Sequence, residues 1–482
     1  MVDSTRRKSL EPYVKDEVEY YPHQIDGIRK LCNQQSFLLA DEMGLGKSLQ
    51  ALTVFAVDVK RDFGKRAIIV CPVTLKENWV DEIEKFTRLN YAVLDGSPRQ
   101  RQQQLFDFDR MDDPKVLIVN YEQVKPHQDD LNSFKFDVAI FDEAHYLKNY
   151  KAQRTKASMG LRAKRCFMLT GTPMLNHVNE LWPLLHKISP TEYPRYWSFV
   201  NRYAVFGGFK NKQIVGVKNE SELTDRLQGH MLRRLKSEVL DLPEIQVIER
   251  RVRLAPEQKR LYDEVRNEMR LPRAIDASVD DIDNALTQFL RLKQICGTTF
   301  PFTGEDISSK LDLAIDDDIE LILNGHKSVA FTQFRDVQAC YVARMRKLSV
   351  GVFELHGDVP KSDRQGIVKA WASTKEPTIL TGMLQIAGLG LTMTAAQHGC
   401  FLDKLFTPGM NQQAMDRLHR IGQDTTQPVQ FREYICIGTI ENRVNQILRT
   451  KKKLFGSIVE TDPDWKRKLY AAILEEEDEA AA

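Results

Sequence analysis

Residues 41–48 have the types and spacing that hold nucleotide phosphates. Their sequence is Asp-Glu-Met-Gly-Leu-Gly-Lys-Ser, between an apolar run and apolar residues at helical spacing. Backbone amides at a helix N-terminus bind anions, and glycines let such a loop curl tightly. We therefore expect Gly44 and Gly46 to shape the loop, Lys47 to neutralise the β- and γ-phosphates, and Ser48 to hold magnesium.

Two observations leave this interpretation open. The general phosphate-loop pattern begins with glycine, whereas Asp41 stands at that place in this chain. A Gly-Leu-Gly-Lys-Ser turn could also occur by chance at the start of a helix. Its position between an apolar strand candidate and an amphipathic helix favours a nucleotide site, but taken alone the loop is only a hint of one.

A second candidate is the adjacent carboxylates Asp142 and Glu143, which follow the apolar run 138–141. Carboxylates at the C-terminal end of a parallel strand lie in the crevice where α/β proteins bind ligands. We expect Asp142 to bind the Mg²⁺ that bridges the phosphates and Glu143 to polarise the attacking water. The alternative is an acidic strand end that caps the following helix.

Arg417 and Arg420 form the third candidate. They are three residues apart on a predicted helix, so both should point from one face. Arginine fingers that reach a γ-phosphate are worth about 10³–10⁵ in rate. A phosphate loop in one half and paired arginines in the other predict a nucleotide held between two lobes, whose hydrolysis moves them. The alternative is a solvated basic helix face, which the neighbouring Gly422-Gln423 and the upstream motifs disfavour.

Two further stretches give weaker signals. Gln24, which follows Tyr-Pro-His, could contact the adenine edge through its amide, or could be an exposed loop residue. Residues 169–173, Leu-Thr-Gly-Thr-Pro, follow an apolar strand candidate. Hydroxyls and a glycine there could sense the surroundings of Glu143 and relay the nucleotide state, although a simple turn would look similar.

Short apolar runs alternate with helical patterns in both halves, which predicts parallel sheets with crossover helices. The strand candidates are 37–40, 67–70, 116–119, 138–141 and 166–169, then 328–331, 352–355, 378–380, 399–402 and 429–434. The stretch of roughly 190–295 between them is rich in aromatic residues and basic helical segments. The sequence therefore predicts an α/β fold of two parallel-sheet lobes with helical protrusions between them.

We divide the chain into five segments on this basis. They are an N-terminal extension (1–19), an ATP-binding lobe (20–190), helical protrusions with a linker (191–295), a second lobe (296–450), and a C-terminal brace with an acidic disordered tail (451–482).

Composition excludes several other classes of protein. At 482 residues, 42% hydrophobic and 28% charged, the chain has the composition of a soluble protein of two or three domains. It has no apolar run of about 18 residues and its N-terminus is polar, so we expect no membrane span, no signal peptide and an intracellular, cytoplasmic protein (nuclear in a eukaryote). Seven scattered cysteines without a Cys-x-x-Cys pair predict reduced core thiols.

These motifs resemble those of the Swi/Snf-type ATPases of helicase superfamily two, over most of residues 20–450. In the family's order, the matching elements are Asp-Glu-Met-Gly-Leu-Gly-Lys-Ser, Asp-Glu-Ala-His, Leu-Thr-Gly-Thr-Pro-Met-Leu-Asn, Met-Leu-Arg-Arg-Leu-Lys at 231–236, Gly-Leu-Gly-Leu at 388–391, and Gln-Ala-x-x-Arg-x-x-Arg-x-Gly-Gln at 413–423. The resemblance implies two tandem RecA-like (P-loop NTPase) lobes. It also implies a monomeric ATP-driven translocase on double-stranded DNA that uses ATP and Mg²⁺.

The resemblance also implies site residues by their position in the motifs. The implied ATP site comprises Gln24, Asp41, Glu42, Met43, Gly44, Leu45, Gly46, Lys47, Ser48, Asp142, Glu143, Gly390, Arg417 and Arg420. The implied contacts to the DNA backbone are Thr74, Asn120, Tyr121, Thr332, Gln333, Arg335, His356 and Gly357.

Two departures from the family pattern lean toward its fork-remodelling, annealing-helicase branch. Phe-Thr-Pro-Gly at 406–409 stands where many remodellers have Trp-Asn-Pro-Ala, and Thr392 replaces an Asn. The chain lacks room for the histone-tail-reading modules that many remodellers append, so we do not expect standalone chromatin remodelling. A role in DNA repair, recombination or replication-fork remodelling is the expectation.

Charge gives no independent signal for DNA, because Lys plus Arg (69) nearly balances Asp plus Glu (67). Basic patches occur at 148–165, 233–253 and 449–453. Each patch could contact phosphates or could be a solvated helix face. We find no base-reading element, which favours sequence-independent backbone contact. Two alternative functions stay open: a strand-separating or annealing DNA or RNA helicase, and a nucleotide-dependent DNA-binding clamp with negligible turnover.

Overall fold

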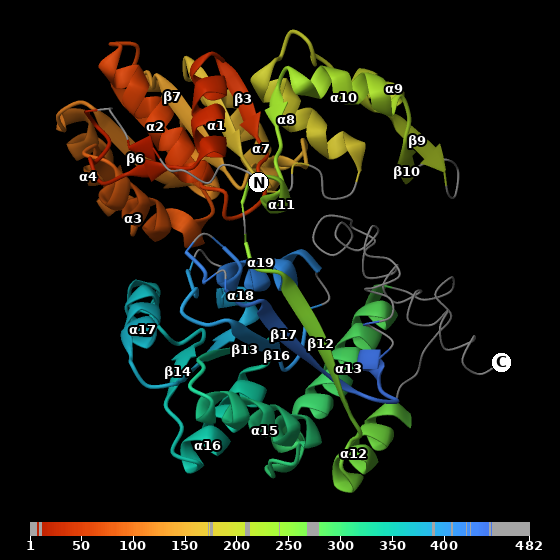
Figure 1. The fold of residues 1–482 in the computed structure, drawn as a ribbon. Coiled ribbons are helices and arrows are strands. Elements are labelled where there is room, and N and C mark those ends of the chain that lie inside the picture. Colours follow the sequence, from red (N-terminus) through yellow and green to blue (C-terminus); the bar gives the residue numbers. More distant parts are fainter. Residues whose placement is uncertain are drawn as a thin grey trace. The chain divides into compact units, whose positions relative to one another are not determined.

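The computed structural model describes residues 7–8, 12–171, 173, 177–207, 213–240, 242–267, 279–387, 391–405, 408–420, 422–424, 426–442 and 445 (Figure 1). The chain divides into two compact units, residues 1–241 and 242–482, and each is described by itself. Several sequence-based expectations lie outside the described residues, namely those on Thr172, Gly390, 406–407 and the tail 451–482.

The first unit is built on a parallel sheet of seven strands, in the order β11-β3-β8-β7-β4-β6-β5. The strands are β3 (Ser36–Leu39), β4 (Arg66–Cys71), β5 (Asn90–Val93), β6 (Lys115–Asn120), β7 (Val138–Asp142), β8 (Arg165–Leu169) and β11 (Met231–Leu232). The five strands predicted for this half are confirmed, and β5 and β11 add its two edges. A separate pair, β1 (Arg7–Lys8) and β2 (Glu19–Tyr20), precedes the sheet.

Helices cover both faces of this sheet. They are α1 (Pro22–Cys32), α2 (Lys47–Lys60), α3 (Lys76–Phe86), α4 (Pro98–Arg110), α5 (Tyr121–Val124), α6 (Gln128–Ser133), α7 (Gln153–Gly160) and α8 (Leu181–Ile188), with short 3₁₀ helices η1 (Val73–Leu75), η2 (Ala144–Leu147) and η3 (Val178–Glu180). Residues of α1, α2 and α3 share one hydrophobic core with the sheet. Residues of α4 to α8 share the other.

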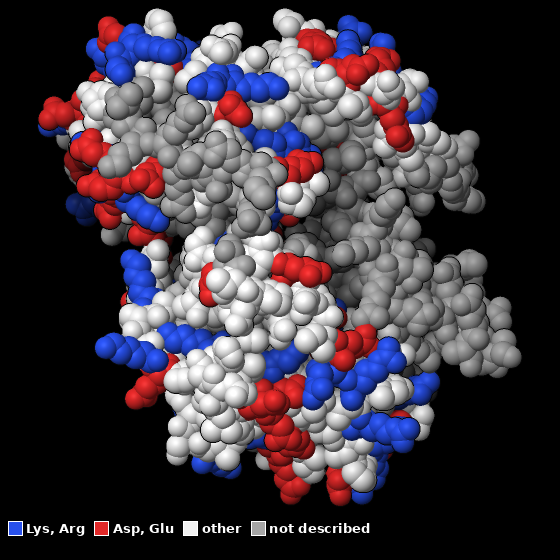
Figure 2. Space-filling model, in the orientation of Figure 1, with Lys and Arg blue, Asp and Glu red and all other residues white. Residues whose placement is uncertain are grey.

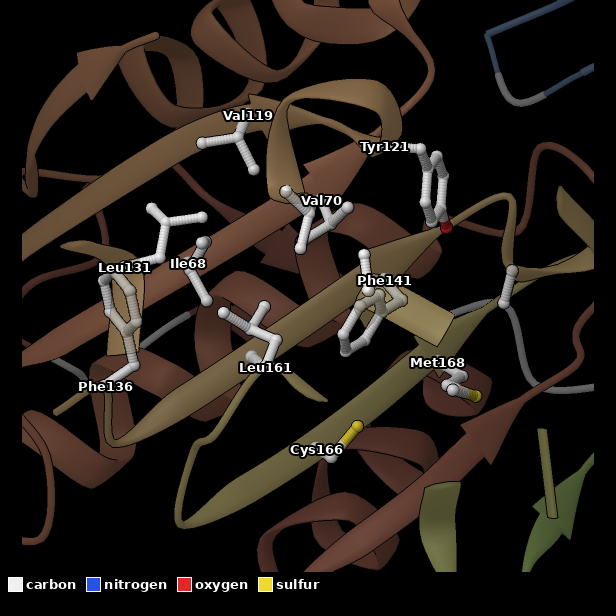
Figure 3. Close-up of a cluster of buried hydrophobic side chains, with 14 of the residues drawn as sticks. Ile68, Val70, Val119, Tyr121, Leu131, Phe136, Phe141, Leu161, Cys166 and Met168 are labelled. Carbon is white, nitrogen blue, oxygen red and sulfur yellow. The ribbon is translucent and has the colours of Figure 1, made fainter. Parts of the chain in front are cut away.

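Alternation along the strands explains why the sheet carries two cores. In β4, Ile68 and Val70 join the core of α4 to α8, whereas Ala67 and Ile69 join the core of α1 to α3. Successive side chains of a strand point to opposite faces, so an unbroken apolar run indicates burial on both sides. Figure 3 shows the core shared with α4 to α8, in which Val119 of β6 and Phe141 of β7 lie with Ile68 and Val70 of β4.

The residues that follow α8 form a smaller cluster with its own core. It contains α9 (Tyr196–Tyr203), the antiparallel pair β9 (Ala204–Gly207) and β10 (Gln213–Val217), and α10 (Glu220–Gln228), and α11 (Lys236–Val239) comes after β11. Residues of η3, α8, α9, β9 and α10 pack together in this core, which includes Tyr193, Phe199 and Tyr203. The aromatic residues of this stretch are therefore largely structural.

The second unit has a parallel sheet of six strands, in the order β12-β17-β16-β13-β15-β14. The strands are β12 (Ile245–Val252), β13 (Ser328–Thr332), β14 (Val352–Leu355), β15 (Ile379–Met383), β16 (His398–Phe401) and β17 (Val429–Cys436). The helices are α12 (Pro256–Asn267), α13 (Val279–Gly297), α14 (Phe300–Thr303), α15 (Ser309–Leu323), α16 (Arg335–Lys347), α17 (Lys361–Ser373), α18 (Leu384–Ala387) and α19 (Pro408–Leu418). All five predicted strands are present, and β12 adds an edge strand from the predicted middle segment.

The second sheet is also buried on both faces. One core includes residues of α17, α18 and α19, and the other includes residues of α15 and α16. The predicted α/β fold of two lobes, each built on a parallel sheet with crossover helices, is therefore confirmed.

Two further expectations can be compared with the described structure. All seven cysteines are free thiols, and six of them are buried, as expected of core residues. Within the described ranges, no helix combines the length and the apolar character that crossing a membrane requires.

Candidate nucleotide site

The loop between β3 and α2 has the backbone that its glycines predict. Gly44 has φ +87° and Gly46 has φ +75°, both in the left-handed region that side chains rarely adopt. Gly46 is also the N-cap of α2, and a Cβ on it would lie 2.4 Å from the amide nitrogen of Gln24. The backbone conformation therefore favours glycine at position 46, and a side chain there would also displace the amide of Gln24.

Gln24 lies against this loop rather than on an exposed surface, since its side chain is buried. Its Nε2 donates to the carbonyl oxygen of Leu45 at 3.3 Å, and its Oε1 accepts from the backbone amide of Tyr21 at 3.0 Å. The exposed-loop alternative is excluded. Both ends of the Gln24 amide are hydrogen-bonded within the protein. Its contact with adenine stays a prediction.

Lys47 begins α2 and turns its side chain back toward the loop. Its Nζ donates to the carbonyl oxygen of Asp41 at 2.8 Å and to that of Glu42 at 3.3 Å. Burial lowers the pKa of this ammonium, and the carboxylates of Glu143, Asp142 and Asp41 act in the opposite direction. A half-buried cation held by neutral carbonyls has the chemistry to accept an anionic phosphate.

Asp142 ends β7 and is held on both sides. One carboxylate oxygen accepts from the indole N–H of Trp79 at 2.9 Å and the other from the amide of Glu143 at 2.9 Å. The hydroxyl of Tyr121 donates to the Asp142 carbonyl oxygen at 2.7 Å. Burial, followed by the charge of Glu143, raises the pKa of Asp142 to about 7. Two crowded carboxylates that resist joint ionisation are a donor set that a divalent cation would stabilise, so these residues fit Mg²⁺.

Glu143 adopts a strained backbone conformation, with φ +48° and ψ +50°. Its Oε2 lies 3.2 Å from Nδ1 of His145, and the same nitrogen lies 3.3 Å from the hydroxyl oxygen of Thr170. The described part of the Leu-Thr-Gly-Thr-Pro stretch is therefore joined to Glu143 through one imidazole. This is the arrangement that a relay between them would need.

Gly171 brings the loop after β8 against the phosphate loop. A Cβ at this position would lie 2.7 Å from Cγ of Met43 and 3.8 Å from Nζ of Lys47. Because β8 lies between β3 and β7 in a parallel sheet, the carboxyl ends of these three strands are neighbours. The first unit therefore gathers Lys47, Asp142, Glu143 and Gly171 at the carboxyl ends of the strands of its sheet.

Arg234 is a part of this site that the sequence analysis missed. Its Nε donates to Oδ1 of Asp41 at 2.9 Å, and a second guanidinium nitrogen donates to Oδ2. It also donates to Gln50 Oε1 at 3.0 Å and to the His23 carbonyl oxygen. Asp41, fully buried, is thus the anchor of the loop, which explains why a carboxylate stands where other phosphate loops have glycine.

The second unit corrects one expectation about Arg417 and Arg420. Arg417 lies in the last turn of α19, but the helix ends at Leu418, so Arg420 lies in the bend that follows. The prediction that one helix face carries both arginines is therefore wrong. After the helix, the side chain of His419 bonds to the Pro243 carbonyl oxygen at 2.8 Å, and Gly422 has φ +98°.

The predicted DNA contacts of the first unit differ in exposure. Thr74 is half-buried in η1. Asn120 is buried and caps α5, with Oδ1 accepting from the Gln123 amide at 3.0 Å. Tyr121 is fully buried and donates to Asp142. The side chains of Asn120 and Tyr121 are thus engaged internally, so a phosphate at this place would meet backbone atoms.

The predicted DNA contacts of the second unit lie at or just after the carboxyl ends of β13 and β14. Thr332 is buried and donates to Asp403, whereas Gln333 Nε2 donates to the Lys404 carbonyl oxygen at 3.0 Å. The side chain of Arg335 is more exposed, and its Nε lies 3.9 Å from Oδ2 of Asp358. The remaining two are the half-buried His356, whose Nδ1 lies 3.3 Å from the same carboxylate, and the exposed Gly357.

A glycine loop between strand and helix, with two carboxylates at the end of a nearby parallel strand, defines a P-loop nucleotide-binding lobe. Residues 23–300 match the SNF2-related domain, and residues 312–422 match the helicase conserved C-terminal domain. The chain belongs to the SNF2-related family.

Individual relatives are similar along nearly the whole chain. An uncharacterized ATP-dependent helicase of Mycoplasma genitalium is 27% identical over 97% of this chain and 44% of its own length. The human DNA annealing helicase and endonuclease ZRANB3 is 29% identical over 90% of this chain and 40% of its own length. The SWI2/SNF2 ATPase core of Sulfolobus solfataricus, solved in complex with double-stranded DNA, is 25% identical, covers 96% of this chain and 97% of its own, and has a TM-score of 0.44. The chain thus spans less than half the length of the two curated relatives.

Proposed function

We propose that this chain hydrolyses ATP with Mg²⁺ and couples hydrolysis to movement along double-stranded DNA. The observation that carries the proposal is the convergence of Lys47, Asp142, Glu143 and Gly171 at the carboxyl ends of the strands of one sheet in a member of the SNF2-related family. The names of its relatives include an ATP-dependent helicase and a DNA annealing helicase, which supports both ATP and DNA as ligands.

The phosphate loop would bind the triphosphate through its backbone amides and Lys47. Gly44 and Gly46 allow amides to point toward an anion, and α2 begins at the same place with a positive dipole end. Ser48 and Asp142 are the residues that would hold Mg²⁺. When bound, Mg²⁺ supplies positive charge to the phosphates.

Glu143 would orient the attacking water. Its backbone strain and its contact with His145 fix the direction of the carboxylate. Thr170, through the same imidazole, would connect that carboxylate to the loop after β8. Gln24 would keep the phosphate loop in its curled form.

Arg417 and Arg420 carry a separate part of the proposal. We propose that they add positive charge to the transition state of hydrolysis, as arginine fingers do. The support for this role is the sequence block in which they stand and the match of that region to the helicase conserved C-terminal domain.

The proposed DNA contacts are local and independent of base sequence. Figure 2 shows Lys and Arg interspersed with Asp and Glu over the face in view, rather than a surface of one sign. Contact would therefore depend on particular groups such as Thr74, Arg335 and His356, together with backbone amides near Asn120 and Gly357. We propose that the protein is monomeric and acts in DNA repair, recombination or fork remodelling.

Phosphate release by the full chain tests this function. It would be measured with no nucleic acid, with single-stranded DNA, with blunt duplex DNA and with RNA, each at several salt concentrations. Duplex DNA should stimulate release most, and the stimulation should fall as salt rises. Stimulation by RNA only, or none by duplex DNA, would overturn the proposal.

A further inference from the structure

Trp197, at the start of α9, is exposed to an extent that no packing role explains. Its exposed fraction is 60%, whereas those of Trp79, Trp182 and Trp371 are 0%, 9% and 0%. The residues of the same helix that face inward, such as Phe199 and Tyr203, are buried in the small core after α8. An exposed indole on a rigid element is available to a ligand.

The indole stands on a stack of other aromatic rings. Trp197 packs edge-on against Tyr196, with ring centroids 5.2 Å apart, and Tyr196 stacks on Tyr150 at 3.9 Å. Trp182 closes the base, meeting Tyr150 and Tyr196 edge-on at 5.9 Å and 5.5 Å. The Tyr196 hydroxyl accepts from Asn179 at 3.2 Å. These contacts fix Tyr196, and Trp197 follows it directly on the same helix, so the indole is presented from an ordered support.

Positive groups border this aromatic platform, which we define as Tyr150, Trp182, Tyr196 and Trp197. Lys151 places Nζ 5.8 Å from the ring centroid of Tyr150, and the exposed Arg195 precedes Tyr196 directly. The acidic residue nearest to Trp197 in sequence, Glu192, is engaged with His230 and Arg226. The exposed indole of Trp197 therefore has Arg195 two residues before it in the chain, and Lys151 lies beside the ring of Tyr150 beneath it.

We propose that the aromatic platform binds unpaired bases of single-stranded DNA. An indole stacks on any base, and a lysine and an arginine beside it suit the phosphates on either side. The faces of paired bases are covered inside a duplex, so this surface goes beyond the proposed duplex track. It also lies outside the proposed ATP-site residues, and its occupation does not depend on hydrolysis.

The test measures binding of a fluorescently labelled oligothymidine of 20 nucleotides to the full chain in the absence of ATP. Trp197→Ala should weaken binding about tenfold, because stacking on one base is lost. Trp197→Phe should restore most of the affinity. Phe63→Ala is the matched control, since Phe63 is an aromatic residue 68% exposed elsewhere on the same unit, and it should bind like the native chain.

A second readout separates a local effect from misfolding and from failure of the proposed ATPase. Oligothymidine should quench the tryptophan fluorescence of the native chain, and Trp197→Phe should lose most of that quenching. Duplex-stimulated phosphate release, if the native chain shows it, should be unchanged in both Trp197 variants. Equal oligothymidine affinity in Trp197→Ala and the native chain would overturn the proposal and leave the platform to a protein partner.

Discussion

Arg234 holds Asp41 across 193 residues of sequence, through two guanidinium donors to the two carboxylate oxygens. The side chain of Asp41 is completely buried and that of Arg234 is 12% exposed. Lys47 donates to the backbone carbonyl oxygen of the same aspartate. Asp41 is therefore held through its side chain by Arg234 and through its backbone by Lys47. In this chain, the buried aspartate that begins the phosphate loop is therefore compensated by an arginine far away in the sequence.

Arg234→Ala should destabilise the first unit and weaken ATP binding. Removal of one partner leaves a buried carboxylate uncompensated, which costs about 3–5 kcal/mol. The double variant Asp41→Ala/Arg234→Ala should be less destabilised than the sum of the two single variants. Denaturant unfolding of all four proteins measures the coupling, and additive changes would contradict a direct interaction.

Lys47→Ala should lose ATP affinity by about tenfold or more, since a charge-assisted contact to phosphate is removed. Lys60→Ala, at the other end of the same helix, is the matched control and should bind ATP normally. Titration with a fluorescent ATP analogue measures both. Equal affinity in Lys47→Ala and Lys60→Ala would remove the assignment of Lys47.

Glu143→Gln should separate binding from turnover. The amide keeps the size of the side chain but does not polarise water, so ATP affinity should persist while phosphate release falls by about 10²–10⁴-fold. The same titration and a phosphate-release assay give the two numbers. Turnover at the native rate would show that another group orients the water.

Tyr121→Phe should reduce turnover more than ATP affinity. The change removes the hydrogen bond to the Asp142 backbone, worth about 1 kcal/mol of stability, and frees the strand end that carries both carboxylates. Tyr91→Phe removes a hydroxyl that bonds Glu84 at the exposed surface and should change neither quantity. Parallel effects of both variants on phosphate release would contradict the role of Tyr121.

The second unit should lose stability on mild acidification. Burial, followed by the neighbouring charges of His326 and Arg432, lowers the pKa of His398 to about 4, whereas Asp318 acts in the opposite direction. The unfolded histidine, with a pKa near about 6.5, therefore binds a proton first. The free energy of unfolding should fall as pH drops from about 6.5 to about 4, by at most about 3 kcal/mol. His398→Gln should flatten this part of the profile in denaturant titrations, and an unchanged slope would contradict His398 as its origin.

The central strands could be predicted from sequence because they are apolar on both faces. β4 and β13 are almost entirely buried, and such runs are visible without knowledge of the fold. The strands missed in the two large sheets were β5, β11 and β12, all at sheet edges, and the small antiparallel pairs β1-β2 and β9-β10 were not predicted either. β12 carries exposed and charged residues along its length, so its sequence has neither the apolar run nor strict alternation. β12 forms a strand because it pairs with β17 along its whole length, which its own sequence does not reveal.

The local parts of the candidate site could be predicted, whereas its long-range support could not. Gly44, Lys47 and Asp142 stand in short motifs whose chemistry depends on neighbouring residues. Arg234 meets Asp41 only after the chain has folded; the aspartate in place of the usual glycine and the motif at 231–236 were noted in the sequence, but neither pairs the two residues. His419, which follows α19, likewise bonds to a residue distant in the sequence, Pro243.

Displacement of a third strand from a triplex tests the central claim most directly, because it reports movement along duplex DNA without requiring strand separation. The full chain would be mixed with a duplex that carries a bound triplex-forming strand, in the presence of Mg²⁺ and ATP. Release of the third strand that needs ATP, that fails in Glu143→Gln and that leaves the duplex strands paired is the predicted result. ATP hydrolysis without any release of the third strand would contradict a translocase.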